Sequence, residues 1–287
     1  MSAQPESGYR GRIAPSPTGF LHLGHARTFW TAQMRARECG GTLVLRIEDL
    51  DRERCRPEFC AAIVEDLRWC GFAWQEGPDM GGNFAPYRQS ERSYLDAWEI
   101  LRARGFIYPC TCSRRDVRAA LGAPHEQRGA VIFDDEPMYP GTCRPALGTI
   151  ADAATPAGVN WRFRVPDGER LSFFDERLAE QRATAGVDFG DFVIWRRDNI
   201  PAYQLAVVAD DAAMRITEVV RGEDLLTSTF RQLLIYRALG LTPPRWFHCP
   251  LVLDEKGERL AKRNDALSLR TLRERGATPE AIREGWI

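Results

Sequence analysis

The stretch PSPTGFLHLGH, Pro15 to His25, decides the fold of the chain around it. Residues 12–14 before it are predicted to end a short apolar strand, and the two prolines and the first glycine of the stretch then form a turn. Apolar residues next recur at spacings of three and four, at Leu23, Ala26, Trp30 and Met34. That spacing is typical of one face of an amphipathic helix, and Gly40 is its expected stop. The sequence therefore predicts the order strand, tight turn, helix.

The two histidines of the stretch are expected to lie at the start of that helix. His22 and His25 stand three residues apart and so share one helix face. Gly24 between them allows a ligand to approach the backbone closely, and the positive end of the helix dipole points to the same place. Imidazoles beside exposed N–H groups favour a polyphosphate site. The alternative is two helix histidines without a special role.

Composition sets broad limits on the class of protein. The chain has 287 residues, of which 44% are apolar and 28% charged, as in ordinary globular proteins. A net charge of −1 gives no global signal for nucleic acid, although a local patch would be enough to bind RNA. The chain shows neither a long apolar run nor a leading signal peptide, so we expect a cytoplasmic protein without membrane contact. Eight cysteines in that setting should stay reduced, and clusters among them would suggest a metal.

The first third of the chain predicts an α/β fold. Residues 42–51 form an apolar run with an acidic end, which is typical of a buried parallel strand that points into a cleft. Helices are expected at 57–70 and 89–104. This strand–helix order predicts a doubly wound parallel sheet that binds ligands at the carboxyl ends of its strands.

The pattern changes after residue 105. Residues 106–175 contain short runs, many glycines and prolines and three cysteines, and are predicted to form an inserted subdomain. Strands are expected at 192–197, 203–209 and 215–221, a helix at 228–239, and short helices over 268–286. We therefore divide the chain into 1–105 and 176–250 as two halves of one catalytic domain, 106–175 as the insert, and 251–287 as a loop with a short helical C-terminus.

A basic segment, RLAKR from Arg259 to Arg263, follows a tight turn late in the chain. Its charges would stabilise negative charge that develops during phosphoryl or nucleotidyl transfer. Alone, such a loop is usually solvated surface. Its interest comes from the pairing with His22 and His25.

These motifs together resemble the class I aminoacyl-tRNA synthetases. HLGH is similar to their HIGH signature and RLAKR to their KMSKS loop, while GRIAPSPTGFLHLGHART, LRIEDLD and AYQLAVVADDAAMRITEVVRGEDLLTST resemble the glutamyl-tRNA synthetases in particular. The resemblance covers Arg10 to about Asp265. It implies a class I synthetase Rossmann-like doubly wound parallel sheet with an inserted zinc-containing subdomain and a short helical C-terminal region.

Two features favour one branch of that family. Only 24 residues follow Arg263, so we expect no anticodon-binding domain. The segments CTC, with Cys110 and Cys112, and YPGTC, with Tyr139 and Cys143, resemble the zinc site of the glutamyl-Q tRNA(Asp) synthetases. Those truncated paralogues attach glutamate to the queuosine base in the anticodon of tRNA(Asp).

The predicted metal ligands are therefore Cys110, Cys112, Tyr139 and Cys143. The Cys-x-Cys spacing is tighter than the usual ligand pair of structural zinc sites, and phenolate is an unusual ligand. Water or His125 would be an alternative in the fourth position. A second alternative is three reduced thiols in an irregular subdomain.

A glutamate pocket needs two cationic donors and one anion, because the ligand carries two carboxylates and one ammonium. Arg12, Arg221 and Glu48 supply these charges, and Tyr203 offers a hydroxyl. The resemblance implies that these residues line the amino-acid site with Ala14 and Ser16. We expect Glu48 and Ser16 to hold the ammonium, Arg12 and Tyr203 the side-chain carboxylate, and Arg221 the α-carboxylate.

The resemblance implies ATP-dependent activation of L-glutamate, without tRNA, and its transfer to queuosine-bearing tRNA(Asp) by a monomer. His22, His25 and Lys262 are the predicted catalytic residues, with Mg²⁺ on the phosphates. ATP would also contact Gly24, Arg259 and Leu260. Arg259 replaces the first lysine of KMSKS, Ala261 its first serine and Arg263 its last serine, so only Lys262 matches a catalytic lysine.

Three other functions stay open at this point. A truncated glutamyl-tRNA synthetase would charge the 3′ end of tRNA(Glu). A nucleotidyltransferase of another class would share the HxGH turn without needing the glutamate residues. A non-enzymatic zinc module that binds RNA would not need both phosphate motifs.

Overall fold

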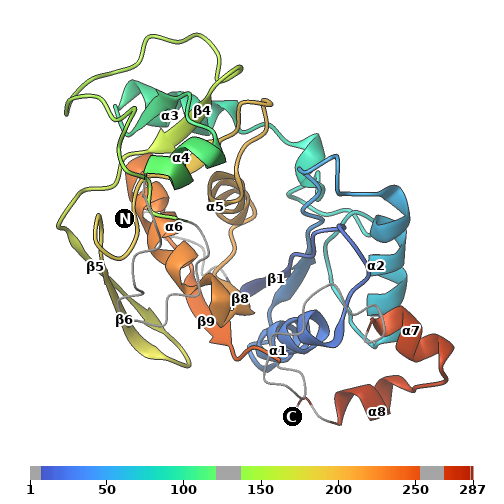
Figure 1. The fold of residues 1–287 in the computed structure, drawn as a ribbon. Helices are drawn as coiled ribbons and strands as arrows, with labels where there is room; N and C mark the ends of the chain where they lie inside the picture. The colour runs from blue at the N-terminus through green and yellow to red at the C-terminus, as the bar shows by residue number, and fades with distance from the viewer. Residues whose placement is uncertain (1–7, 121–136, 253–267, 285, 287) are drawn as a thin grey trace. The chain divides into compact units, whose positions relative to one another are not determined.

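The computed structural model describes residues 8–120, 137–252, 268–284 and 286, and its chain divides into two compact units (Figure 1). The first unit contains residues 1–92, 213–223 and 244–287, and the second contains 93–212 and 224–243. The boundaries of the four segments that the sequence suggests stay predictions.

The first unit is an α/β arrangement built on parallel strand pairs, as the sequence predicts. Strands β1 and β2 run parallel, as do β8 and β9. The elements of this unit are β1 (Arg10–Ile13), α1 (Leu23–Glu38), β2 (Thr42–Leu45), α2 (Pro57–Trp69), the 3₁₀-helix η1 (Gln89–Glu91), β8 (Glu218–Gly222), β9 (Arg245–Cys249), α7 (Leu269–Glu274) and α8 (Pro279–Arg283). Thr217 joins β8 to β1, because its N–H donates to the backbone oxygen of Arg10 at 2.9 Å.

Helix α1 packs one face against this sheet. Its small buried residues Ala26, Ala32 and Ala36 allow the helix to approach β1 and β8 closely, and Trp30 packs at the edge of the same core. The helix ends at Glu38 with Cys39 as its C-cap, directly before the glycine that the sequence suggests as a stop. The apolar spacing of the sequence thus places the helix correctly.

The second unit contains two antiparallel β-structures and several helices. In the first, β4 (Asn160–Phe163) lies between β3 (Ile107–Cys110) and β7 (Phe192–Trp195). In the second, β5 (Arg170–Asp175) pairs with β6 (Ala179–Thr184) as a hairpin. The helices are α3 (Leu95–Ala103), α4 (Arg114–Ala120), α5 (Tyr203–Ala213) and α6 (Leu226–Leu239), with the short η2 (Glu223–Leu225) before α6.

Two sequence-based elements are wrong. The sequence predicts a strand at 203–209, but these residues begin helix α5. This helix is buried on most sides, so the apolar residues in this stretch show no helical period. The single helix expected at 89–104 is instead η1 and α3, because Arg92 has extended φ and ψ angles of −105° and 156° that end the first of them. Strand β9 was not predicted at all.

No helix in the described part of the chain combines the length and the apolar character that a membrane span requires.

Candidate active site and metal centre

The two predicted catalytic histidines lie together at the start of α1. His22 is the residue before the helix, and its backbone oxygen accepts from the N–H of Ala26 at 3.1 Å. The imidazoles of His22 and His25 stack with 3.8 Å between ring centroids and 28° between ring planes. Both rings therefore stand beside the first turn, whose N–H groups point out of the helix and attract anions.

Gly24 keeps the space beside His22 open. A Cβ atom on Gly24 would lie 3.2 Å from both Cε1 and Nδ1 of His22, and 3.7 Å from Cβ of Val252. Any side chain here would press on the imidazole. The glycine is thus explained by its close packing against His22, one of the two predicted catalytic residues.

Two arginines of the predicted glutamate set come from neighbouring strands. Arg12 on β1 is 5% exposed, and its Nη1 donates to the backbone oxygen of Val220 at 3.1 Å. Arg221 on β8 is 4% exposed, and its Nε donates to Nε2 of His248 at 3.2 Å. Because a guanidinium is always protonated, that Nε2 must be the unprotonated nitrogen of the ring. His248 is buried on β9 and was missed by the sequence analysis.

Glu48 follows β2 and has a fixed carboxylate. Its Oε1 lies 2.9 Å from Nη2 of Arg46, whose side chain is fully buried. The N–H of Glu48 donates to the backbone oxygen of Pro15 at 3.0 Å, which ties the acidic end of the strand to the turn before His22. Ala14 is half-buried and Ser16 exposed within that turn. The structure thus gathers the turn, Glu48 and the two buried arginines in one unit.

Other predicted site residues lie elsewhere. Tyr203 is the first residue of α5 in the second unit, and 37% of it is exposed. The ATP-loop residues Arg259, Leu260 and Lys262 lie outside the described residues, and so does His125. Their roles stay predictions.

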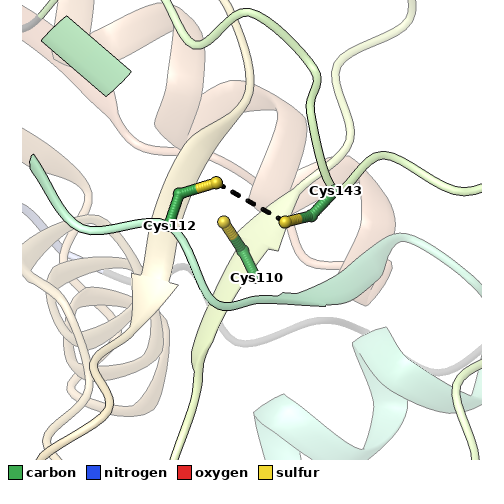
Figure 2. A group of neighbouring side chains, drawn as sticks. All are labelled: Cys110, Cys112 and Cys143. Atoms are coloured by element: carbon green, nitrogen blue, oxygen red, sulfur yellow. Dashed lines mark hydrogen bonds between the residues drawn. The ribbon is translucent and has the colours of Figure 1, made fainter. Parts of the chain in front are cut away.

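The predicted cysteines form a cluster in the second unit (Figure 2). The Sγ atoms of Cys110, Cys112 and Cys143 all lie within 4.8 Å of one another, and those of Cys112 and Cys143 are 3.5 Å apart. Within the described ranges, this is the one group of three or more histidine, cysteine or acidic side chains placed to hold a metal ion. It could hold a metal such as zinc.

The fourth predicted ligand belongs to the same cluster. The hydroxyl of Tyr139 lies 3.4 Å from Sγ of Cys110 and 3.6 Å from Sγ of Cys112. Tetrahedral zinc, with bonds of about 2.3 Å to sulfur and 2.0 Å to oxygen, places such atoms about 3.5 Å apart. The backbone N–H of Cys143 also donates to this hydroxyl at 2.7 Å. The hydroxyl of Tyr139 thus lies from two of the sulfurs at about the distance that a shared tetrahedral ion would require.

Protonation in the cluster also favours metal binding at Cys143. Burial raises the pKa of Cys143, but hydrogen bonds with Tyr139, Thr111 and Cys112 outweigh burial and lower this pKa to about 6. Burial and the contact with Cys110 raise the pKa of Tyr139. One thiolate is therefore available at neutral pH, as soft metal ions require.

The strand–turn–helix site with its stacked histidines is that of a class I synthetase, and comparison with known proteins gives the family. The chain belongs to the tRNA synthetases class I (E and Q): the model of their catalytic domain matches residues 9–287. It is 48% identical over 279 residues to a protein of Symbiobacterium thermophilum named glutamyl-Q tRNA(Asp) synthetase. This alignment covers 95% of the present chain and 83% of that protein.

Longer relatives are similar as well. The chain is 46% identical to glutamate–tRNA ligase 1 of Halorhodospira halophila, over 94% of this chain and 56% of the ligase. The crystal structure of a glutamate tRNA ligase from Elizabethkingia meningosepticum matches 90% of this chain with a TM-score of 0.74 and 30% identity. The chain spans about half the length of these ligases.

Proposed function

We propose that this protein activates L-glutamate with ATP, without tRNA, and transfers it to the queuosine base in the anticodon of tRNA(Asp). The family and the similarity to a protein named for that reaction support the proposal. The observation that carries it is that the three charged residues predicted to bind glutamate, Arg12, Arg221 and Glu48, all have buried side chains in the first unit.

These charges match the ligand. Glutamate brings two carboxylates and one ammonium, and Arg12, Arg221 and Glu48 offer two cations and one anion. Arginine suits carboxylates because its fork donates two parallel hydrogen bonds. In the proposed pose, Glu48 and Ser16 hold the ammonium, Arg221 takes the α-carboxylate, and Arg12 takes the side-chain carboxylate.

The α-carboxylate of glutamate then attacks the α-phosphorus of ATP, and pyrophosphate leaves. His22 and His25 stand at the positive end of α1, where they stabilise the negative charge that develops on the phosphate oxygens. Lys262 would add a further positive charge. Mg²⁺ would accompany ATP and neutralise its phosphates. The glutamyl-adenylate finally gives its acyl group to a hydroxyl of queuosine, and AMP leaves.

We also propose that Cys110, Cys112, Cys143 and Tyr139 hold one structural zinc ion. Zinc would cross-link the end of β3 to the segment that carries Tyr139 and Cys143. A monomer acting in the cytoplasm, where tRNA is found, completes the proposal.

Glutamate-dependent exchange of pyrophosphate into ATP tests the first half of the reaction. The proposal expects exchange with glutamate and no added RNA, and a loss of about 10²–10³-fold in His25→Ala, the scale of one transition-state donor. The conservative variant His25→Gln, which keeps a hydrogen-bond donor, should retain more activity. Exchange that needs tRNA, or that His25→Ala leaves unchanged, would contradict the assignment.

A further inference from the structure

We propose that Arg162 is a positioning residue of the cysteine cluster: it supplies the buried positive charge that lets three thiolates and Tyr139 bind one zinc ion. This inference rests on the proposed zinc site. Arg162 was not singled out by any sequence motif.

Arg162 faces two of the four ligands directly. Its Nε donates to Sγ of Cys110 at 3.3 Å, and its guanidinium carbon lies 3.8 Å from the ring centroid of Tyr139. The first contact places a hydrogen bond on a ligand sulfur. The second covers one face of the phenol ring and fixes its orientation. One side chain therefore restrains both a thiolate and the oxygen ligand.

The backbone holds Arg162 rigidly in this place. It lies on β4, the middle strand of the three-stranded sheet, opposite Tyr108 on β3. Its neighbours Trp161 and Phe163 are buried and point to the opposite face, because side chains alternate along a strand. Nη1 of Arg162 also donates to the backbone oxygen of Asp191 at 3.1 Å. A side chain so anchored can orient metal ligands.

Charge explains why a cation is needed here. Zinc with three thiolates carries a net charge of −1, and a phenolate would make it −2. Burying such a charge without a partner is costly. Arg162 is 6% exposed, so its own charge is also largely buried and the two compensate each other.

The neighbouring arginine is engaged differently. Nε of Arg144 lies 3.1 Å from a carboxylate oxygen of Asp191, and its Nη1 donates to the carboxylate of Asp167. Arg144 thus contacts two carboxylates and the backbone oxygen of Val165, whereas Arg162 contacts Cys110 and Tyr139 of the ligand set. This division assigns the charge compensation to Arg162.

Zinc affinity tests the inference directly. The apparent dissociation constant is measured by competition with a chromophoric chelator on wild type, Arg162→Met and Arg162→Lys. Outer-shell partners typically contribute 10–100-fold in metal affinity, so Arg162→Met should bind about 10–100-fold more weakly. Arg162→Lys keeps the charge but loses the planar fork, and should be about 3–10-fold weaker. Arg164→Met is the matched control, directly after the end of β4, because Arg164 donates to the backbone oxygens of Pro145 and Ala146; it should stay within about 2-fold.

A cobalt spectrum separates a role at the metal from a merely structural role. Cobalt-loaded wild type should show the visible bands of a tetrahedral thiolate site, and these bands should shift in Arg162→Lys but not in Arg164→Met. Wild-type affinity and an unchanged spectrum in Arg162→Lys would overturn the inference, even if Arg162→Met does not fold. If wild type itself binds no metal, the proposed zinc site fails first, and the two failures are thereby distinguished.

Discussion

Replacing Gly24 with alanine should lower activity without lowering stability. The added Cβ would lie 3.2 Å from two atoms of the His22 ring, which must then move by a few tenths of an ångström. A misplacement of about 1 Å near the reacting groups costs about 10²-fold, so this smaller shift should reduce adenylate formation by about 3–10-fold. Gly24 is the second residue of α1, where alanine favours the helix by up to about 1 kcal/mol. Stability should therefore be unchanged or slightly higher.

The measurement pairs glutamate-dependent ATP–pyrophosphate exchange with thermal unfolding. Gly19→Ala is the control, because a Cβ on Gly19 would meet nothing within 4 Å. It should keep both exchange and melting temperature close to wild type. Full exchange activity in Gly24→Ala would refute the role of this close contact, and a melting temperature lower by about 5 °C or more would show that the helix itself was disturbed.

Three further predictions concern the metal, the amino-acid pocket and acid stability. Cys143→Ser should remove zinc from protein purified without added metal, as elemental analysis would show; one zinc per chain in this variant would contradict the ligand set. His248→Ala should raise the KM for glutamate by about 10-fold with a smaller change in kcat, because the hydrogen bond to His248 that helps to orient Arg221 is lost, and an unchanged KM would argue against that role. Burial raises the pKa of Glu218, but hydrogen bonds from Arg35 and Tyr9 outweigh the effect of burial. The pKa of Glu218 therefore lies below its usual value. The ionised carboxylate therefore adds stability that is complete above about pH 4.5 and is lost as the pH falls through the lower pKa of the folded state. The difference in the free energy of urea unfolding between wild type and Glu218→Gln should therefore shrink as the pH falls below about 4.5. A difference that stays constant with pH would contradict the pairing.

The parts of the fold that the sequence predicts well are those with strong local signals. The prolines and glycine before His22 exclude regular structure, and the apolar period after it fits a helix with one buried face. Helix α5 and strand β9 lack such signals. The run at the start of α5 is buried on most sides, and β9, which begins at Arg245, mixes charged and aromatic residues. Tertiary packing, not local preference, decides both.

The same contrast holds for the sites. Cys110, Cys112 and Cys143 could be found because thiols at close spacing have few other uses, and the structure brings them together. His248 and Arg162 could not be found, because each acts through a partner that is distant in sequence. A histidine in an apolar strand and an arginine between aromatic residues carry no signature by themselves. Only the strand register reveals them.

The central claim concerns the RNA that accepts glutamate, and one labelling experiment tests it most directly. Labelled glutamate, ATP and the protein are incubated with tRNA(Asp) from cells that make queuosine, with tRNA(Asp) from cells that cannot, and with tRNA(Glu). We predict label on the first RNA alone. Equal labelling of the two tRNA(Asp) preparations, or strong labelling of tRNA(Glu), would contradict the account and favour a ligase that charges the 3′ end of tRNA(Glu).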